Sequence, residues 1–193
     1  MRALTLSVII PTTGQPSLRR TLASVGEQEL VPGDEVLLVC DGHYPEAAEA
    51  WRASGLPGEC VEIDGPHGDW GSAARTEGLS RARGDFIAYM DDDDIYAPGA
   101  FETVRAILAE NPELPHMFRM RYGGTQSCLW RSPEVEMGNV GTPMFLHPNG
   151  GRWGRWGARY ECDFDFIAST AALFPRVVWR EEVIAIIRPP AGG

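Results

Sequence analysis

Four apolar runs recur in the first part of the chain, and each one ends in a polar turn. They cover residues 4–10, 35–40, 60–63 and 86–90, and the first is almost continuously apolar. Continuous apolar character, rather than alternation, is typical of strands that are buried on both faces. The pattern therefore predicts four strands within a parallel sheet.

Between these runs, apolar residues are spaced three or four positions apart, which predicts helices. Leu18, Leu22 and Val25 show this spacing after the first run. Three more helices are expected, over residues 46–52, 72–82 and 101–108. The alternation of strand and helix predicts an α/β fold: a mostly parallel sheet with helices on both faces and right-handed crossovers.

From about Leu114 the pattern is less regular and rich in glycine. Strands are predicted over residues 117–122, 127–131 and 141–147, and residues 177–187 predict either a strand pair or one bent strand. No linker or internal repeat divides the chain. We therefore expect one domain over residues 1–193, with a change of character near residue 112.

The clearest candidate for chemistry is the acidic cluster, Asp91 to Asp94, which directly follows the fourth predicted strand. Four adjacent like charges repel one another unless they are solvated or neutralised by a cation. Open α/β sheets bind ligands at the carboxyl ends of their strands, and carboxylate oxygens suit Mg²⁺ or Mn²⁺. A solvated acidic turn that caps the next helix is the simpler alternative, but capping does not need four acids.

Two other predicted strands end in polar residues, namely Pro11-Thr12-Thr13 and Asp41, and Arg75 lies on the helix before the acidic cluster. Because parallel strands share one carboxyl edge, these residues are expected to meet there. Asp41 can then accept from a base N–H, and Arg75 can neutralise phosphate. The alternatives are local strand-end hydrogen bonding for the threonines and a solvated helix charge for Arg75.

Composition excludes several classes of function. The formal net charge of −10 argues against a binder of nucleic-acid backbones and against electrostatic docking on anionic lipid. No apolar run approaches the roughly 20 residues of a membrane span, so no stable membrane insertion is expected. The four cysteines lack C-x-x-C spacing, which argues against zinc and favours reduced thiols in a cytoplasmic protein.

Three segments together resemble family 2 glycosyltransferases of the GT-A fold. They are residues 7–25, residues 36–42 and residues 74–98, which include the acidic cluster. The resemblance implies a Rossmann-like GT-A sheet, a nucleoside-diphosphate sugar as donor, most often a UDP-sugar, and a D-x-D motif that holds Mn²⁺ or Mg²⁺. It also implies transfer with inversion.

By position, Asp91-Asp92-Asp93 matches the D-x-D motif, with Asp91 on the ribose or base side and Asp93 on the metal. The nucleotide-binding set implied by the resemblance is Pro11, Thr12, Thr13, Asp41, Arg75, Asp91 and Asp92. The metal set is Asp93, Asp91 and His147, with a plain surface histidine as the alternative for His147. Cys40, Gly14 and His43 depart from residues that are common in the family, which leaves the nucleotide preference open.

Transfer to a hydroxyl also needs a base that takes up its proton. The family places this base in an acidic pair at the start of a helix in its second half, and residues 160–166 match that place. Asp163 is therefore assigned as the base. Cys162 stands where the family has the first acid of the pair, and Glu161, one position earlier, is assigned to take the role of that acid. The alternative is that these acids only begin a helix that runs towards Leu173.

We therefore predict a metal-dependent inverting glycosyltransferase, with residues 1–112 binding the nucleotide-sugar and metal. Residues 113–193 are expected to supply the base and the acceptor side, where Trp130, Trp153, Trp156 and Tyr160 either line the acceptor cleft or pack in the core. The acceptor classes left open are a glycan, a lipid-linked sugar, a protein and a modified nucleic acid, and a homodimer is allowed. The alternatives are a nucleotidyltransferase, although residues 11–16 lack its glycine-rich basic loop, and a non-catalytic nucleotide-sugar-binding domain.

Overall fold

The computed structural model describes residues 3–190, and residues 1–2 and 191–193 lie outside the described part. Its elements are β1 (Leu6–Thr12), α1 (Leu18–Gly26), β2 (Glu35–Asp41), α2 (Pro45–Ser54), β3 (Gly58–Ile63), α3 (Ser72–Arg81), β4 (Phe86–Tyr89), β5 (Ile95–Tyr96), α4 (Ala100–Leu108), β6 (His116–Tyr122), β7 (Cys128–Leu129), η1 (Thr142–Met144), β8 (Phe145–Pro148), α5 (Cys162–Ala171) and β9 (Val178–Ile187).

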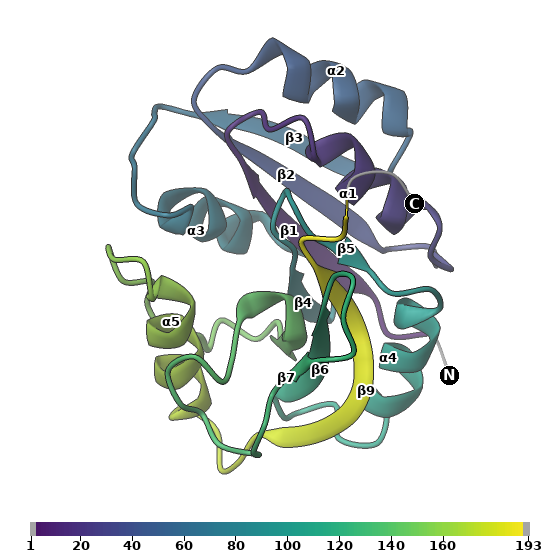
Figure 1. Ribbon diagram of the computed structural model, residues 1–193, viewed down its shortest axis with the longest axis vertical. Helices are drawn as coiled ribbons and strands as arrows, with labels where there is room; N and C mark the ends of the chain where they lie inside the picture. Colours follow the sequence, from purple (N-terminus) through teal and green to yellow (C-terminus); the bar gives the residue numbers. More distant parts are fainter. Residues whose placement is uncertain (1–2, 191–193) are drawn as a thin grey trace.

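The first four long strands form a parallel block in the order β3–β2–β1–β4. Every residue of β1 and β2 is buried, as their continuous apolar runs predict. In Figure 1, α3 and α5 lie to the left of the sheet, and α1 and α4 lie to its right. The expected α/β fold with helices on both faces is confirmed.

In the second half the sheet continues as β8–β6–β9–β5, with β7 on the side of β6. This part is mixed: β6 and β9 are parallel, whereas β8 is antiparallel to both β4 and β6. Residues 178–187 form the single bent strand β9, which curves across the lower right of Figure 1. The strand predicted from residue 141 starts only at Phe145, because Pro143 and its neighbours form the short 3-10 helix η1.

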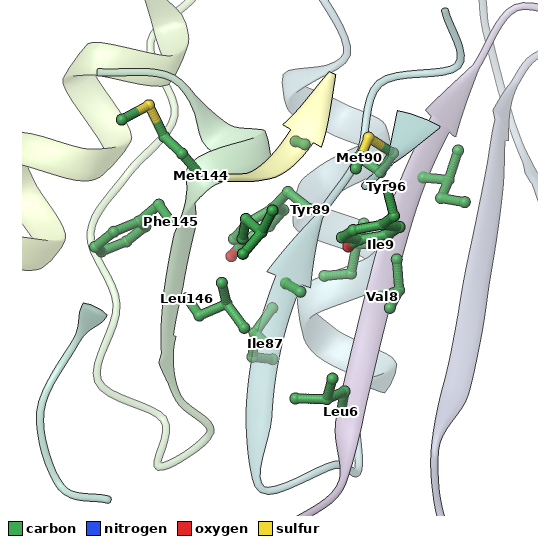
Figure 2. Close-up of a cluster of buried hydrophobic side chains, with 14 of the residues drawn as sticks. Leu6, Val8, Ile9, Ile87, Tyr89, Met90, Tyr96, Met144, Phe145 and Leu146 are labelled. Carbon is green, nitrogen blue, oxygen red and sulfur yellow. The ribbon is translucent and has the colours of Figure 1, made fainter. Parts of the chain in front are cut away.

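The core between β1, β4 and β8 positions the carboxyl ends of the strands. Leu6, Ile9, Ile87 and Leu146 belong to the buried apolar core on the two faces of these strands (Figure 2), and each such buried side chain contributes about 1.5–3 kcal/mol. The Met90 N–H donates to the Ile9 carbonyl at 3.0 Å, so the pairing of β4 with β1 runs up to the acidic cluster.

Buried polar contacts fix the opposite end of the parallel block. Glu35 at the start of β2 accepts a hydrogen bond from the Ser7 hydroxyl at 2.7 Å and pairs with the Arg83 guanidinium at 2.8 Å. Asp34 accepts from the Leu6 N–H at 2.8 Å. The strands of the first half are therefore held in register at their amino ends while their carboxyl ends carry the polar residues.

Candidate active site

A cavity of about 480 Å³ opens at the carboxyl ends of β1, β2 and β4. Its lining includes every residue of the predicted nucleotide-binding set together with Asp93: Pro11, Thr12, Thr13, Asp41, Arg75, Asp91, Asp92 and Asp93. The rule that parallel strands share one carboxyl edge therefore brings these residues to one place, as the sequence analysis expected. We call this space the nucleotide cavity.

Arg75 on α3 lies in the wall of this cavity and is only 4% exposed, so it is not a solvated helix charge. Its Nη2 lies 2.5 Å from Asp91 Oδ1 and 3.9 Å from Asp163 Oδ1. Burial opposes its charge, but Asp91 and Asp163 outweigh that effect, and the pKa of Arg75 is raised. Its Nε is buried with no hydrogen-bond partner in the described part of the chain, which leaves a donor for an anion.

Three members of the acidic cluster converge. Asp91, Asp93 and Asp94 each offer a carboxylate oxygen, and these oxygens lie within 4.8 Å of one another. Burial, together with neighbouring carboxylates, raises the pKa of Asp91 to about 6 and that of Asp94 to about 8. Such crowding favours either protonation or a bound cation, and an all-oxygen donor set fits Mg²⁺ or Mn²⁺.

Asp92 turns away from this group towards β1. Its Oδ2 accepts a hydrogen bond from the Thr12 hydroxyl at 2.6 Å, and the same hydroxyl accepts from the Gly14 N–H at 3.0 Å. Thr12 thus connects the acidic cluster to the turn after β1. The simpler prediction of purely local bonding for Thr12 is incomplete, because one of its partners lies 80 positions away.

His147 is neither a neighbour of the acidic cluster nor a surface histidine. It is fully buried on β8, with Nε2 2.8 Å from the Tyr89 hydroxyl and Nδ1 3.1 Å from the Pro148 carbonyl. Burial lowers its pKa to about 4. The prediction of a metal ligand here needs correction, because β8 pairs with the first residues of β4 and so places His147 away from the end of that strand.

Asp41 at the end of β2 already has partners. Its carboxylate accepts from the His67 N–H at 3.0 Å and lies 2.5 Å from His67 Nδ1. The hydrogen bond with Asp41 raises the pKa of His67. A nucleobase N–H that reaches Asp41 must therefore share or replace these contacts. The sequence analysis missed His67, which lies in a loop and belongs to no recognised motif.

Asp163, in the first turn of α5, lies behind Arg75 and is not itself part of the cavity lining. Its Oδ2 accepts from the Thr142 hydroxyl at 3.0 Å and from the Thr142 N–H at 3.3 Å, while its Oδ1 is the oxygen nearer Arg75. Glu161 precedes the helix and lies 4.0 Å from Arg159. Of the two predicted catalytic acids, Asp163 is the one that shares Arg75 with Asp91.

Arg188 is a further charged residue at this site that the sequence analysis missed. Its N–H donates to Asp94 Oδ1 at 2.7 Å, and its Nε lies 3.7 Å from Asp93 Oδ2. It follows β9, which pairs with β5 directly after the acidic cluster. This pairing joins residues some 90 positions apart, and β5 has only two residues, so no periodicity in the sequence signals it.

The four predicted aromatic candidates differ in their surroundings. Trp130 is buried and packs edge-on against Trp179, and Trp156 stacks on Phe166 with ring centroids 3.9 Å apart. Trp153 is half-buried against the core. Tyr160 is exposed, which leaves it as the candidate of the four that presents its ring to solvent.

Comparisons with known proteins agree with this geometry. A model of the family described as glycosyl transferase family 2 matches residues 7–173. No curated protein matches the sequence. Among the described residues, no helix is long and apolar enough to cross a membrane.

Several solved structures share the fold. TarS 1-349 of S. aureus, solved in complex with UDP-GlcNAc, is 18% identical with a TM-score of 0.78, over 98% of this chain and 60% of that chain. The mannosyltransferase PcManGT from Pyrobaculum calidifontis, solved in complex with GDP-Man and Mn²⁺, is 16% identical with a TM-score of 0.70, over 100% of this chain and 59% of that chain. The chain thus spans about 60% of the length of these two structures.

Proposed function

Because the chain belongs to glycosyl transferase family 2, we propose that it is a metal-dependent inverting glycosyltransferase. Its donor is a nucleoside-diphosphate sugar, with UDP as the expected nucleotide, and its acceptor is a hydroxyl. The observation that carries the proposal is the position of Arg75, which lines the cavity and lies between Asp91 of the acidic cluster and Asp163. Family membership favours glycosyl transfer over the nucleotidyltransferase alternative.

The donor occupies the nucleotide cavity in this proposal. Thr12, Thr13 and Asp41 face the nucleoside, and Arg75 faces the diphosphate, because its buried guanidinium keeps an unpaired N–H. The nucleotide-sugar complexes of TarS and PcManGT support a donor of this class, with UDP in the first and GDP in the second.

Asp91, Asp93 and Asp94 would hold the cation, since their oxygens are close together and chemically suited to Mn²⁺ or Mg²⁺. When bound, the ion supplies positive charge that stabilises the departing diphosphate. Arg75, and the exposed Arg188 beside Asp93, add positive charge from the protein itself. This charge is directed at the part of the substrate that becomes more negative during the reaction.

Asp163 takes up the proton of the acceptor hydroxyl. As the acceptor oxygen forms its bond to the anomeric carbon, the bond from that carbon to the diphosphate oxygen breaks, and the electron pair leaves with the diphosphate. Attack from the opposite side inverts the anomeric carbon. Thr142 holds one oxygen of Asp163 through two hydrogen bonds, which fixes the direction of the carboxylate.

We also propose a division of work between the two halves of the chain. Residues 1–112 bind the donor and the metal, and residues 113–193 provide Asp163 and contact the acceptor, within one domain. The continuous sheet supports this proposal, because β4 pairs directly with β8 and so joins the two halves.

Thermal denaturation with a panel of donors tests the donor site. UDP-, GDP-, CMP- and dTDP-sugars are compared with and without Mn²⁺, and a ligand at 100 times its dissociation constant stabilises the fold by about 2.7 kcal/mol. We expect one nucleotide to raise the melting temperature in a metal-dependent way.

Asp93→Asn should abolish the metal-dependent part of this shift, whereas Glu27→Gln, an exposed residue outside the cavity, should leave it intact. If no nucleotide-sugar stabilised the wild-type protein with Mn²⁺ or Mg²⁺, the donor assignment would be wrong. If Asp163→Asn bound the donor normally and still transferred the sugar at the wild-type rate, the assignment of Asp163 as the base would be wrong.

A further inference from the structure

Trp70 has an unusual backbone conformation next to the nucleotide cavity. Its φ of 61° lies in the left-handed region, which it shares with Arg188 alone among the non-glycine residues of the described part of the chain. For a bulky residue this conformation is an outlier that carries a conformational cost. Core packing does not offset that cost, because the side chain is 59% exposed. Such outliers cluster at functional sites.

The backbone of Trp70 is held by hydrogen bonds from two helices, α3 and α5. Its carbonyl accepts a hydrogen bond from Arg75 Nη1 at 2.7 Å and a weaker one from the Cys162 thiol at 3.8 Å. The preceding residue, Asp69, accepts from the Ala73 N–H at 2.8 Å and so fixes the start of α3. The backbone at Trp70 is therefore held by contacts to α3 and to the first residue of α5.

The Trp70 ring meets one other exposed aromatic ring. Tyr160, which is 65% exposed, lies edge-on to it with ring centroids 5.0 Å apart and planes at 85°. Trp70 lines the nucleotide cavity, whereas Tyr160 lies outside that lining, three residues before Asp163. The aromatic pair, Trp70 and Tyr160, thus extends from the donor cavity towards the base.

We propose that the aromatic pair is the acceptor subsite and that the acceptor is a saccharide, with one sugar ring stacked on Trp70. This inference rests on the proposed function. One face of a pyranose ring consists largely of C–H groups, which pack on a flat aromatic ring while the hydroxyls around the rim stay hydrated. An exposed indole ring beside a phenol ring provides such a surface with polar groups at its edges.

The position of the pair assigns it to the acceptor rather than to the donor. The donor diphosphate is expected beside Arg75 and the acidic cluster, whereas the acceptor hydroxyl has to reach Asp163. Tyr160 and Asp163 flank the start of the same helix, so a sugar on the pair lies on the side of the base.

Charge complementarity favours a neutral saccharide. Glu161 lies 4.0 Å from Arg159 and Asp163 lies 3.9 Å from Arg75, so the local charges are mixed, while the whole chain has a net charge of −10. That net charge opposes a polyanionic acceptor and does not oppose a neutral one. A neutral sugar with free hydroxyls is the acceptor class that fits both the rings and the net charge.

Saturation-transfer difference NMR on the full chain tests this inference. With saturating UDP and the diamagnetic ion Mg²⁺, the probes are the neutral disaccharides cellobiose, lactose, maltose and chitobiose. We expect at least one to receive saturation on its ring C–H protons. Trp70→Ala and Tyr160→Ala should weaken its affinity about tenfold, the size expected for a stacked aromatic contact. Tyr122→Ala, an exposed tyrosine on β6, is the matched control and should change affinity less than twofold.

Trp70→Gly separates function from stability. Glycine adopts positive φ without strain, so this variant should melt at the same temperature as the wild type or higher, yet bind the disaccharide as weakly as Trp70→Ala. Trp70→Phe should restore most of the affinity. A lowered melting temperature for Trp70→Gly with unchanged disaccharide binding would make the ring structural and overturn the inference.

Two further outcomes overturn it without touching the proposed function. One is wild-type protein that binds UDP and Mg²⁺ but gives no signal on any of the disaccharides. The other is a Trp70→Ala variant that loses affinity for a UDP-sugar relative to UDP while its disaccharide binding is unchanged, which assigns the ring to the donor sugar. Wild-type protein that binds a disaccharide through Trp70 but binds no nucleotide would instead defeat the proposed function and leave a saccharide site.

Discussion

In the first half of the chain, the site residues stand at the ends of buried parallel strands, whereas in the second half the proposed base, Asp163, stands at the end of a glycine-rich segment. Thr12 and Asp41 are the last residues of β1 and β2, and Asp91 lies just after β4, in a block of strands that pair in parallel. Their backbone positions are fixed mainly by sheet geometry. Asp163 depends on the path of residues 149–160, which form no strand or helix.

In residues 149–160, hydrogen bonds with side chains replace the backbone pairing that a strand or helix would provide. The Gly154 N–H donates to the Thr170 hydroxyl at 2.9 Å, and the Arg155 N–H donates to the Ser169 hydroxyl at 3.0 Å. On the other side, the Ser72 hydroxyl donates to the Gly157 carbonyl at 2.8 Å. A few side-chain bonds to α5 and α3 therefore hold the segment, so single substitutions should disturb the second half more than the first.

The largest effect that we expect comes from Asp163. Asp163→Asn should lower turnover by about 100- to 10,000-fold, the usual contribution of a general base, because an amide cannot take up the acceptor proton. Binding of UDP with Mn²⁺ should stay within a few-fold of wild type, since donor binding belongs to the first half. Asp165→Asn, on the same helix and paired with Arg159, is the control and should retain turnover. Steady-state kinetics and calorimetry measure the two quantities.

Mild acid should remove the contribution of His147, in the second half, before that of Glu35, in the first half. Folded His147 takes up a proton only near pH 4, whereas the unfolded chain takes it up near the ordinary pKa of 6.5. The stability that neutral His147 contributes is therefore complete above pH 6.5 and is lost as the pH falls towards 4, by up to about 3 kcal/mol.

Glu35 in the first half responds at lower pH than His147. Burial acts to raise the pKa of Glu35, but hydrogen bonds from Ser7 and Arg83 outweigh it and lower the pKa below 4.5. Its contribution therefore persists at pH 5 and is lost only as the pH falls through that lowered value. When the pH is lowered from 7.5 to 5, the melting temperature of His147→Gln should fall less, or rise more, than that of the wild type, while Glu35→Gln should be destabilised equally at both pH values. An unchanged difference in His147→Gln would contradict this assignment.

Two glycines give a smaller contrast in stability. A Cβ at Gly154 would lie 2.6 Å from the Thr170 backbone nitrogen, so Gly154→Ala should cost about 1–3 kcal/mol. At Gly26, the last residue of α1, a Cβ would meet only Leu56 at 3.9 Å. Gly26→Ala should therefore stabilise the protein by about 0.4–1 kcal/mol. Urea denaturation measures both, and equal effects at the two sites would remove the contrast between the halves.

The same contrast explains how far the sequence could be interpreted. The apolar runs of β1, β2 and β4 identify buried strands, and the shared carboxyl edge then places Thr12 and Asp91 together without further information. His147 could not be placed in this way, because nothing in its neighbourhood shows that a polar ring is buried against Tyr89. Arg188 reaches the acidic cluster through β5, a strand too short to produce a pattern.

The pairing of β9 has a consequence for folding during translation. Because β9 pairs with both β5 and β6, and Arg188 after it donates to Asp94, the environment of the acidic cluster is completed by residues that are translated some 90 positions later. A nascent chain that has released its first half from the ribosome still lacks these contacts. The acidic cluster therefore acquires these contacts only once β9 has emerged, which couples the surroundings of residues 91–94 to a strand that is made some 90 positions later.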